Sequence, residues 1–208
     1  MSWKLALASL CLPPWTVRRE LSRVGAATTS ILDRLLDDCA SEALEAVRRD
    51  ELPPRGPLRR RRAALASAHT VRVRRLVEAL GRDIAMEEAR RALFEVGVKL
   101  GEEARHRLGV RRTRRDLLQA ARILYRVLGI RFQVEWTARD AARVRITRCA
   151  LARRYTLETC LALSAADAGV VAGLWPGTTL TFDERITQGK AACLARLVLP
   201  DVAEAELR

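Results

Sequence analysis

The side chains best suited to chemistry in this chain are its thiols, since its two histidines, His69 and His106, are too few for a His-rich metal site. The five cysteines are Cys11, Cys39, Cys149, Cys160 and Cys193, an odd number without a C-x-x-C pair. This pattern fits neither a disulfide framework nor a structural zinc site, so we expect free thiols in a reducing cytoplasm, no metal and no cofactor. The alternative is zinc held jointly by Cys149, Cys160 and Cys193, whose spacings lack a zinc-finger signature.

Cys149 stands where an alternating stretch of sequence gives way to a helical one. A thiol at a helix N-terminus has a lowered pKa, and neighbouring arginines act in the same direction. Cys149 is therefore a candidate nucleophile or acid, the alternative being a small buried apolar side chain. The same alternative applies to Cys193, which lies on an expected strand among apolar neighbours.

Asp167 is the candidate general base. It falls in the middle of an expected helix with apolar residues on both sides. Burial against a sheet would raise its pKa toward the range useful for proton transfer at neutral pH. The alternative is a structural carboxylate paired with Arg145 or Arg148.

Helical periodicity dominates the first two thirds of the chain and predicts the elements that position these groups. The pattern predicts helices over residues 31–49 after a Thr28–Ser30 cap, over 70–108 with a break at Gly81–Asp83, over Asp116–Leu128 between Thr113 and Gly129, and over 150–174. Gly97 and Gly101, one helical turn apart, indicate a close approach of another backbone.

Alternation of apolar and polar residues predicts the strands. They are expected over Ile130–Trp136, Ala142–Thr147, Thr178–Arg185 and Ala191–Leu199. We therefore predict an α+β fold, in which a helical N-terminal half packs on an antiparallel sheet of about four strands in the order strand–strand–helix–strand–strand.

A proline-rich break at Glu51–Pro57, followed by Arg59–Arg62, is the best linker candidate. It divides the chain into a helical extension and Pro/Arg-rich linker over residues 1–60 and an α+β domain over residues 61–208. The role of the first part is open; it could cover the sheet or form a contact in a homo-oligomer.

Three segments resemble the L-2-amino-thiazoline-4-carboxylic acid hydrolase family: ITRCALARRY from Ile146, LSAADAGVVAGLWPG from Leu163 and TLTFDERITQGKAACLARL from Thr179. Upstream, LGRDIAMEEARRALFEVGVKLGEE is similar to the helical lead-in of that family, so the resemblance covers roughly Thr70–Leu199. It implies ring-opening hydrolysis of a small cyclic amidine or a related C–N/C–S substrate. The family pattern, transferred by position, makes Cys149, Asp167 and Cys193 catalytic.

Five further residues are candidates for substrate binding: Ser164, Thr187, Gly189, Lys190 and Trp175. Thr187 and Lys190 could hold a substrate carboxylate, and Trp175 could cover the pocket. Their alternatives are a turn with positive φ at Gly189, a solvated Lys190 and a core plug at Trp175.

Two positions depart from the family pattern. Ser164 replaces a common cysteine, and Ala195 replaces a common aromatic residue. The Ser164 departure favours the alternative function, a non-catalytic small-molecule-binding or sensor domain on the same scaffold, as in the similar four-vinyl-reductase type of domain. The Ala195 departure implies a different pocket shape.

The composition is basic, with 38 Lys and Arg against 25 Asp and Glu in 208 residues. Arg59–Arg62 and the run Arg111–Arg115 could neutralise phosphates, but aromatic residues make up only 4% of the chain, which leaves few stacking platforms for nucleic acid. We therefore expect solvated basic faces and a small-molecule ligand. The chain has no apolar run of about 20 residues, and we expect no membrane span.

Overall fold

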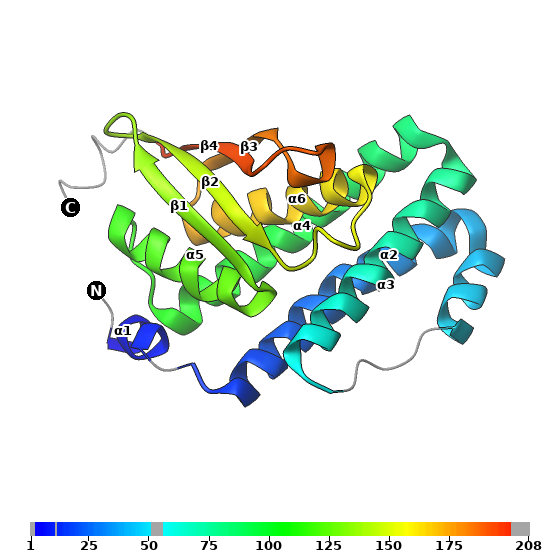
Figure 1. Ribbon diagram of the computed structural model, residues 1–208, viewed down its shortest axis with the longest axis horizontal. Coiled ribbons are helices and arrows are strands. Elements are labelled where there is room, and N and C mark those ends of the chain that lie inside the picture. The colour runs from blue at the N-terminus through cyan, green and yellow to red at the C-terminus, as the bar shows by residue number, and fades with distance from the viewer. Residues whose placement is uncertain (1–2, 11, 51–55, 201–208) are drawn as a thin grey trace.

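The computed structural model describes residues 3–10, 12–50 and 56–200 (Figure 1). The elements in chain order are α1 (Trp3–Leu10), α2 (Pro14–Asp50), α3 (Leu58–Leu80), α4 (Arg82–Leu108), α5 (Arg114–Leu128), β1 (Ile130–Trp136), β2 (Ala141–Cys149), α6 (Leu157–Leu174), β3 (Thr179–Glu184), the 3-10 turn η1 (Ile186–Gln188) and β4 (Cys193–Val198). The α+β class and the predicted order of elements are confirmed.

The four strands form one antiparallel sheet in the spatial order β1-β2-β4-β3. Alternate residues of each strand face the core, including Val144, Ile146 and Leu197. The opposite face is exposed and carries arginines, such as Arg143 and its cross-strand neighbour Arg196. The period-two pattern of the sequence therefore corresponds to one buried and one solvated face.

The helices lie on one side of this sheet in successive layers (Figure 1). One core cluster joins the inner sheet face to α5 and α6, with Leu117 and Leu174 among its buried residues. A second cluster joins α2, α3 and α4 to the far side of α6, with Leu36 and Leu93 fully buried. α6 thus belongs to both cores and is the central element of the molecule.

α4 and α6 pack backbone to backbone. A Cβ added at Gly97 would lie 2.2 Å from the Ala166 carbonyl oxygen, and one at Gly169 would lie 2.1 Å from the Phe94 carbonyl oxygen. Gly101 and Gly173 repeat the arrangement one turn along. The close approach expected from Gly97 and Gly101 is confirmed, and the glycines of α6 complete it.

Local signals explain several helix ends. The Thr113 hydroxyl accepts a hydrogen bond from the Asp116 N–H at 3.2 Å, and Gly129 ends α5 with a left-handed φ of 73°. Gly81, with a φ of 75°, separates α3 from α4 as predicted. These residues fix where α5 leads into β1 and where the α3–α4 hairpin reverses.

The predicted start at Thr28–Ser30 is wrong, because α2 begins at Pro14 and is interrupted only by non-helical geometry at Ala40. The Thr28 and Thr29 hydroxyls donate to backbone carbonyls one turn earlier, such as that of Gly25, and therefore do not cap a helix. Threonine occurs both at helix N-caps and inside helices, so Thr28–Ser30 did not by themselves identify the start of the helix.

The predicted linker lies partly outside the described residues, since 51–55 are not among them. Arg59–Arg62 belong to α3, and the boundary drawn after residue 60 falls inside that helix. α2 packs along α3 and α4, so residues before and after the boundary share the second core.

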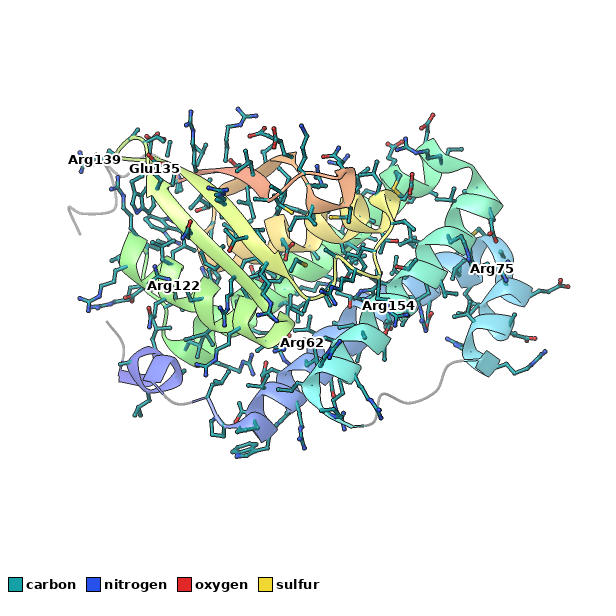
Figure 2. The ribbon with its side chains drawn as sticks, in the orientation of Figure 1. Arg62, Arg75, Arg122, Glu135, Arg139 and Arg154 are labelled. Carbon is teal, nitrogen blue, oxygen red and sulfur yellow. The ribbon has the colours of Figure 1, made fainter. Side chains whose placement is uncertain are left out.

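α6 is the one described helix long and apolar enough to cross a membrane by length and composition. Half of that segment is buried inside the fold, where it packs between α4 and the sheet. These contacts account for its apolar composition. Most charged side chains lie at the periphery instead, as Arg75, Arg122 and Arg139 do in Figure 2, whereas Arg72 and Asp116 are buried.

Candidate functional site

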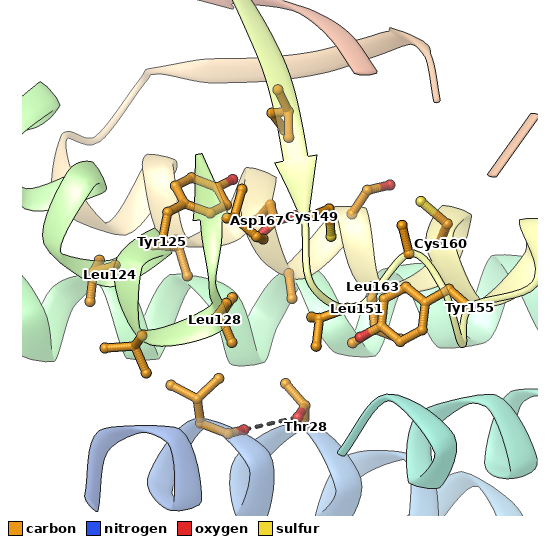
Figure 3. Close-up of a pocket in the computed structure, with 18 of the residues that line it drawn as sticks. Thr28, Leu124, Tyr125, Leu128, Cys149, Leu151, Tyr155, Cys160, Leu163 and Asp167 are labelled. Atoms are coloured by element: carbon orange, nitrogen blue, oxygen red, sulfur yellow. Dashed lines mark hydrogen bonds between the residues drawn. The ribbon is translucent and has the colours of Figure 1, made fainter. Parts of the chain in front are cut away.

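An apolar cavity of about 130 Å³ lies between the sheet–α5–α6 layer and the helices α2 and α3 (Figure 3). α6 and α5 supply more of its wall than any other elements, and the segment after β2 closes it on one side. The apolar lining includes Val24, Leu65, Leu100, Leu124, Leu128, Ile130, Ile146, Leu151, Leu163, Val170, Val171, Leu174, Phe182 and Ile186. A cavity of this size and character holds a ligand roughly as large as benzene.

The structure brings five of the sequence-predicted site residues to this one cavity. Cys149, Ser164, Asp167, Thr187 and Cys193 all line it. They come from β2, α6, η1 and β4, and 44 positions of sequence separate the first from the last. The predicted roles of these residues in catalysis or binding stay predictions.

Asp167 projects from the middle of α6 toward Tyr125 on α5 (Figure 3). Burial raises the pKa of its carboxyl from 3.8 to about 7, although a hydrogen bond from the Tyr125 hydroxyl opposes the shift. The expected upward shift is therefore present. Arg145 and Arg148 are exposed on the sheet, and no ion pair joins either to Asp167 within the described ranges.

Cys149 does not begin a helix. β2 ends at this residue, and α6 starts only at Leu157, after a turn. Burial raises the pKa of the thiol to about 11, while backbone N–H groups of Leu151 and Ala152 oppose the shift. The expected lowering of the Cys149 pKa is wrong, because the helix N-terminus lies elsewhere and desolvation disfavours the thiolate.

Two more thiols border the same space. Cys193 is buried on β4, and the Ile186 N–H donates to its sulfur at 3.3 Å. Burial raises the pKa of Cys193 and that of Cys160. The cysteines 39, 149, 160 and 193 are free, and among described residues no three His, Cys, Asp or Glu side chains form a group that could hold a metal ion.

The other three sequence candidates lie outside the cavity lining. Trp175 is buried in the sheet–helix core at the end of α6. Gly189 has a φ of 79° and ends η1, which fits its alternative as a turn glycine. The Lys190 amine lies 3.9 Å from a carboxylate oxygen of Glu184 on the exposed side of the turn.

Sequence reasoning missed a buried hydrogen-bond chain at the α2–α3 side of the cavity. His69 Nε2 lies 2.8 Å from the Thr28 hydroxyl, and His69 Nδ1 lies 2.8 Å from the Tyr155 hydroxyl. Burial, with a smaller contribution from the Arg72 charge, lowers the pKa of His69 to about 3. The imidazole is therefore neutral at physiological pH.

For the tyrosines of the cavity, the available sequence signal was their low number. The chain has two tyrosines, and both of them, Tyr125 and Tyr155, line the cavity. Burial raises the pKa of each hydroxyl well above its ordinary value of 10. Both phenols therefore stay protonated, and each is already engaged, Tyr125 with the Asp167 carboxyl and Tyr155 with His69 Nδ1.

Glu20 and Arg23 of α2 are half-buried charged residues of the cavity lining. Glu20 pairs with Arg23 at 3.1 Å and with Arg107 of α4 at 2.7 Å, and Arg23 also pairs with Glu103. This ion-pair group connects α2 to α4 beside the apolar lining. The charges of Glu20 and Arg23 are therefore paired with each other and with residues of α4.

A search of protein-family models and of curated proteins finds no match. Among solved structures, the chain is similar to a trafficking protein particle complex subunit 3 from Naegleria fowleri, covalently bound to palmitic acid. The TM-score is 0.54 at 13% sequence identity, over 67% of this chain and 95% of that one. At this identity the likeness concerns the fold alone.

Proposed function

We propose that this chain is a non-catalytic small-molecule-binding protein whose ligand occupies the cavity between α2, α5 and α6. The observation that carries the proposal is the cavity itself, which is apolar over most of its wall and has a few polar groups at defined places. Ligand sites of proteins have this composition, in which apolar contacts give affinity and sparse polar groups give orientation.

The size of the cavity defines the ligand class. About 130 Å³ fits a single ring or a short branched chain. The Naegleria fowleri protein carries palmitic acid, which supports an apolar ligand for this fold. A palmitoyl chain is several times larger than benzene, so we favour a ring-sized ligand for this chain.

The thiol chemistry favours binding over nucleophilic catalysis. With a pKa of about 11, Cys149 is almost entirely protonated at pH 7, and an activated nucleophile needs the thiolate. Burial acts on Cys160 and Cys193 in the same direction.

The second candidate function is hydrolysis of a small cyclic amidine. Asp167 favours it, because a carboxyl with a pKa of about 7 can accept a proton from water at neutral pH. In this case Asp167 would be the base, and the three cavity thiols would shape the pocket.

One experiment separates the two functions. Purified protein is incubated with ring-sized compounds, including 2-amino-thiazoline-4-carboxylate, and binding is followed by saturation-transfer NMR while products are followed by mass spectrometry. We expect binding without turnover. Ala121→Phe, which places a ring into the cavity from α5, should abolish binding, whereas Ala79→Phe on the exposed side of α3 should not.

Turnover of the thiazoline that disappears in Asp167→Asn would contradict the binding proposal and support the hydrolase. Binding that survives Ala121→Phe in folded protein would show that the ligand site lies elsewhere.

A further inference from the structure

Two buried hydrogen-bond donors beside the η1 end of the cavity have no nitrogen or oxygen partner within the described part of the chain. They are Nε of Arg185 and the hydroxyl of Thr187, two residues apart in the segment that joins β3 to β4. Thr187 lines the cavity and its hydroxyl contacts the Cys160 thiol, a weak acceptor, whereas Arg185 lies behind the lining residues. Buried polar groups in proteins are nearly always hydrogen-bonded, and an unpaired donor is costly. Their proximity in one segment beside a cavity calls for a ligand group that accepts.

Arg185 also lacks a carboxylate partner among the described residues. The two acids that precede it on β3 are engaged elsewhere, Asp183 with Arg196 at 3.1 Å and Glu184 with Lys190 at 3.9 Å. The contacts of the Arg185 guanidinium are neutral. It donates from Nη2 to the Ser164 hydroxyl at 3.2 Å and lies 5.3 Å from the centre of the Phe182 ring.

The positive charge of Arg185 lies next to residues that line the cavity. Ser164, Phe182 and Thr187 all line the cavity, so the guanidinium reaches the wall through its contacts with Ser164 and Phe182. The pKa values of Cys160 and Cys193 are raised mainly by burial, and the Arg185 charge opposes that rise at both thiols. A positive potential therefore exists at this end of an otherwise apolar space.

We infer that the ligand carries a carboxylate, which binds at the η1 end of the cavity between Arg185 and Thr187. This inference rests on the proposed binding function and names the chemistry of the ligand. The carboxylate accepts hydrogen bonds from Arg185 Nε and from the Thr187 hydroxyl, and the positive charge of Arg185 balances its negative charge. The apolar body of the ligand lies along α6 against Leu163 and Ile146.

The test uses two probes of nearly equal size, benzoate and benzyl alcohol, with titration calorimetry on the purified full chain. We expect wild type to bind benzoate more tightly than benzyl alcohol. Arg185→Gln should weaken benzoate binding by about tenfold or more and leave benzyl alcohol within about twofold. Thr187→Val should act in the same direction with a smaller effect.

The matched control is Arg196→Gln, which removes a neighbouring arginine from the exposed face of the sheet. It should leave both affinities unchanged, and circular dichroism checks the folding of every variant. Equal loss of both probes in Arg185→Gln, or equal affinity of wild type for both, would overturn the carboxylate site while leaving the binding function standing. Failure of wild type to bind either probe would overturn both.

Discussion

The two sides of α6 differ in how they are packed. On the α4 side, Gly97 and Gly169 bring two backbones so close that a single methyl group has no room. On the α5 side, the same helix borders a cavity of about 130 Å³ that contains a carboxyl, phenols and thiols. Dense packing stabilises, whereas unfilled space and buried ionisable groups cost stability and commonly mark function.

The strongest test of the dense side is Gly169→Val. Its Cβ would overlap the Phe94 carbonyl oxygen, and backbone atoms cannot move aside without separating the helices. We expect a loss of about 5 kcal/mol in the free energy of unfolding, measured by urea denaturation.

The control is Gly25→Ala in α2, where the added Cβ meets only the end of the Leu65 side chain at 3.0 Å. A change of less than about 1 kcal/mol is expected there. Equal losses at both glycines would mean that the α4–α6 contact is not special.

The cavity side is tested by the pH dependence of Asp167. Its pKa is about 7 in the folded protein and 3.8 in the unfolded chain, so the folded state holds the proton more tightly. This carboxyl therefore contributes stability at low pH that is lost as the pH rises from about 4 through 7. Relative to Asp167→Asn, wild type should lose about 4 kcal/mol between pH 4 and pH 8.

Urea denaturation at several pH values provides this measurement. Asp183→Asn, on the exposed part of β3, should retain the pH dependence of wild type. A pH-independent difference between wild type and Asp167→Asn would refute the burial of the charge.

The contribution of His69 to the free energy of unfolding should have the opposite pH dependence. Its pKa is about 3 when folded and 6.5 when unfolded, so its contribution is complete above pH 6.5 and declines as the pH falls toward 3. Relative to His69→Gln, wild type should lose about 2 kcal/mol between pH 7 and pH 5. His106→Gln, which alters the exposed histidine, should leave the slope intact, and a slope that persists in His69→Gln would assign the titration to another group.

The smallest expected effect on stability comes from filling the cavity with a larger side chain. Ala121→Phe should leave the unfolding free energy unchanged or raise it by about 1 kcal/mol, because added apolar contacts replace the cavity. Thermal denaturation measures it. A loss of several kcal/mol would show that this part of α5 is already as tightly packed as α4.

The same contrast explains what the sequence could predict. Periodicity and turn residues predicted the strands, the α3–α4 break at Gly81 and the ends of α5, because each depends on neighbouring residues. The α2 start and the turn after Cys149 were mispredicted, since Thr28–Ser30 and residues 150–156 carry signals that tertiary packing overrides.

The site was only partly predictable for a related reason. Cys149, Asp167 and Cys193 stood out by type and by family resemblance, and they line one cavity. Arg185 and His69 did not stand out, because an arginine among many and a histidine inside a helix gain meaning only from what faces them across space. Shifts in pKa depend on burial, which a linear pattern indicates but does not measure.

The glycine contact between α4 and α6 has a kinetic consequence for any occupant of the cavity. Because α4 and α6 are held backbone to backbone, we expect ligand exchange to use the opposite side of the cavity, where α2 is held by the ion pairs of Glu20 and Arg23. The residence time of a ligand in the cavity would then depend on ionic strength, because salt weakens the charged contacts of α2 and does not affect the glycine contact between α4 and α6.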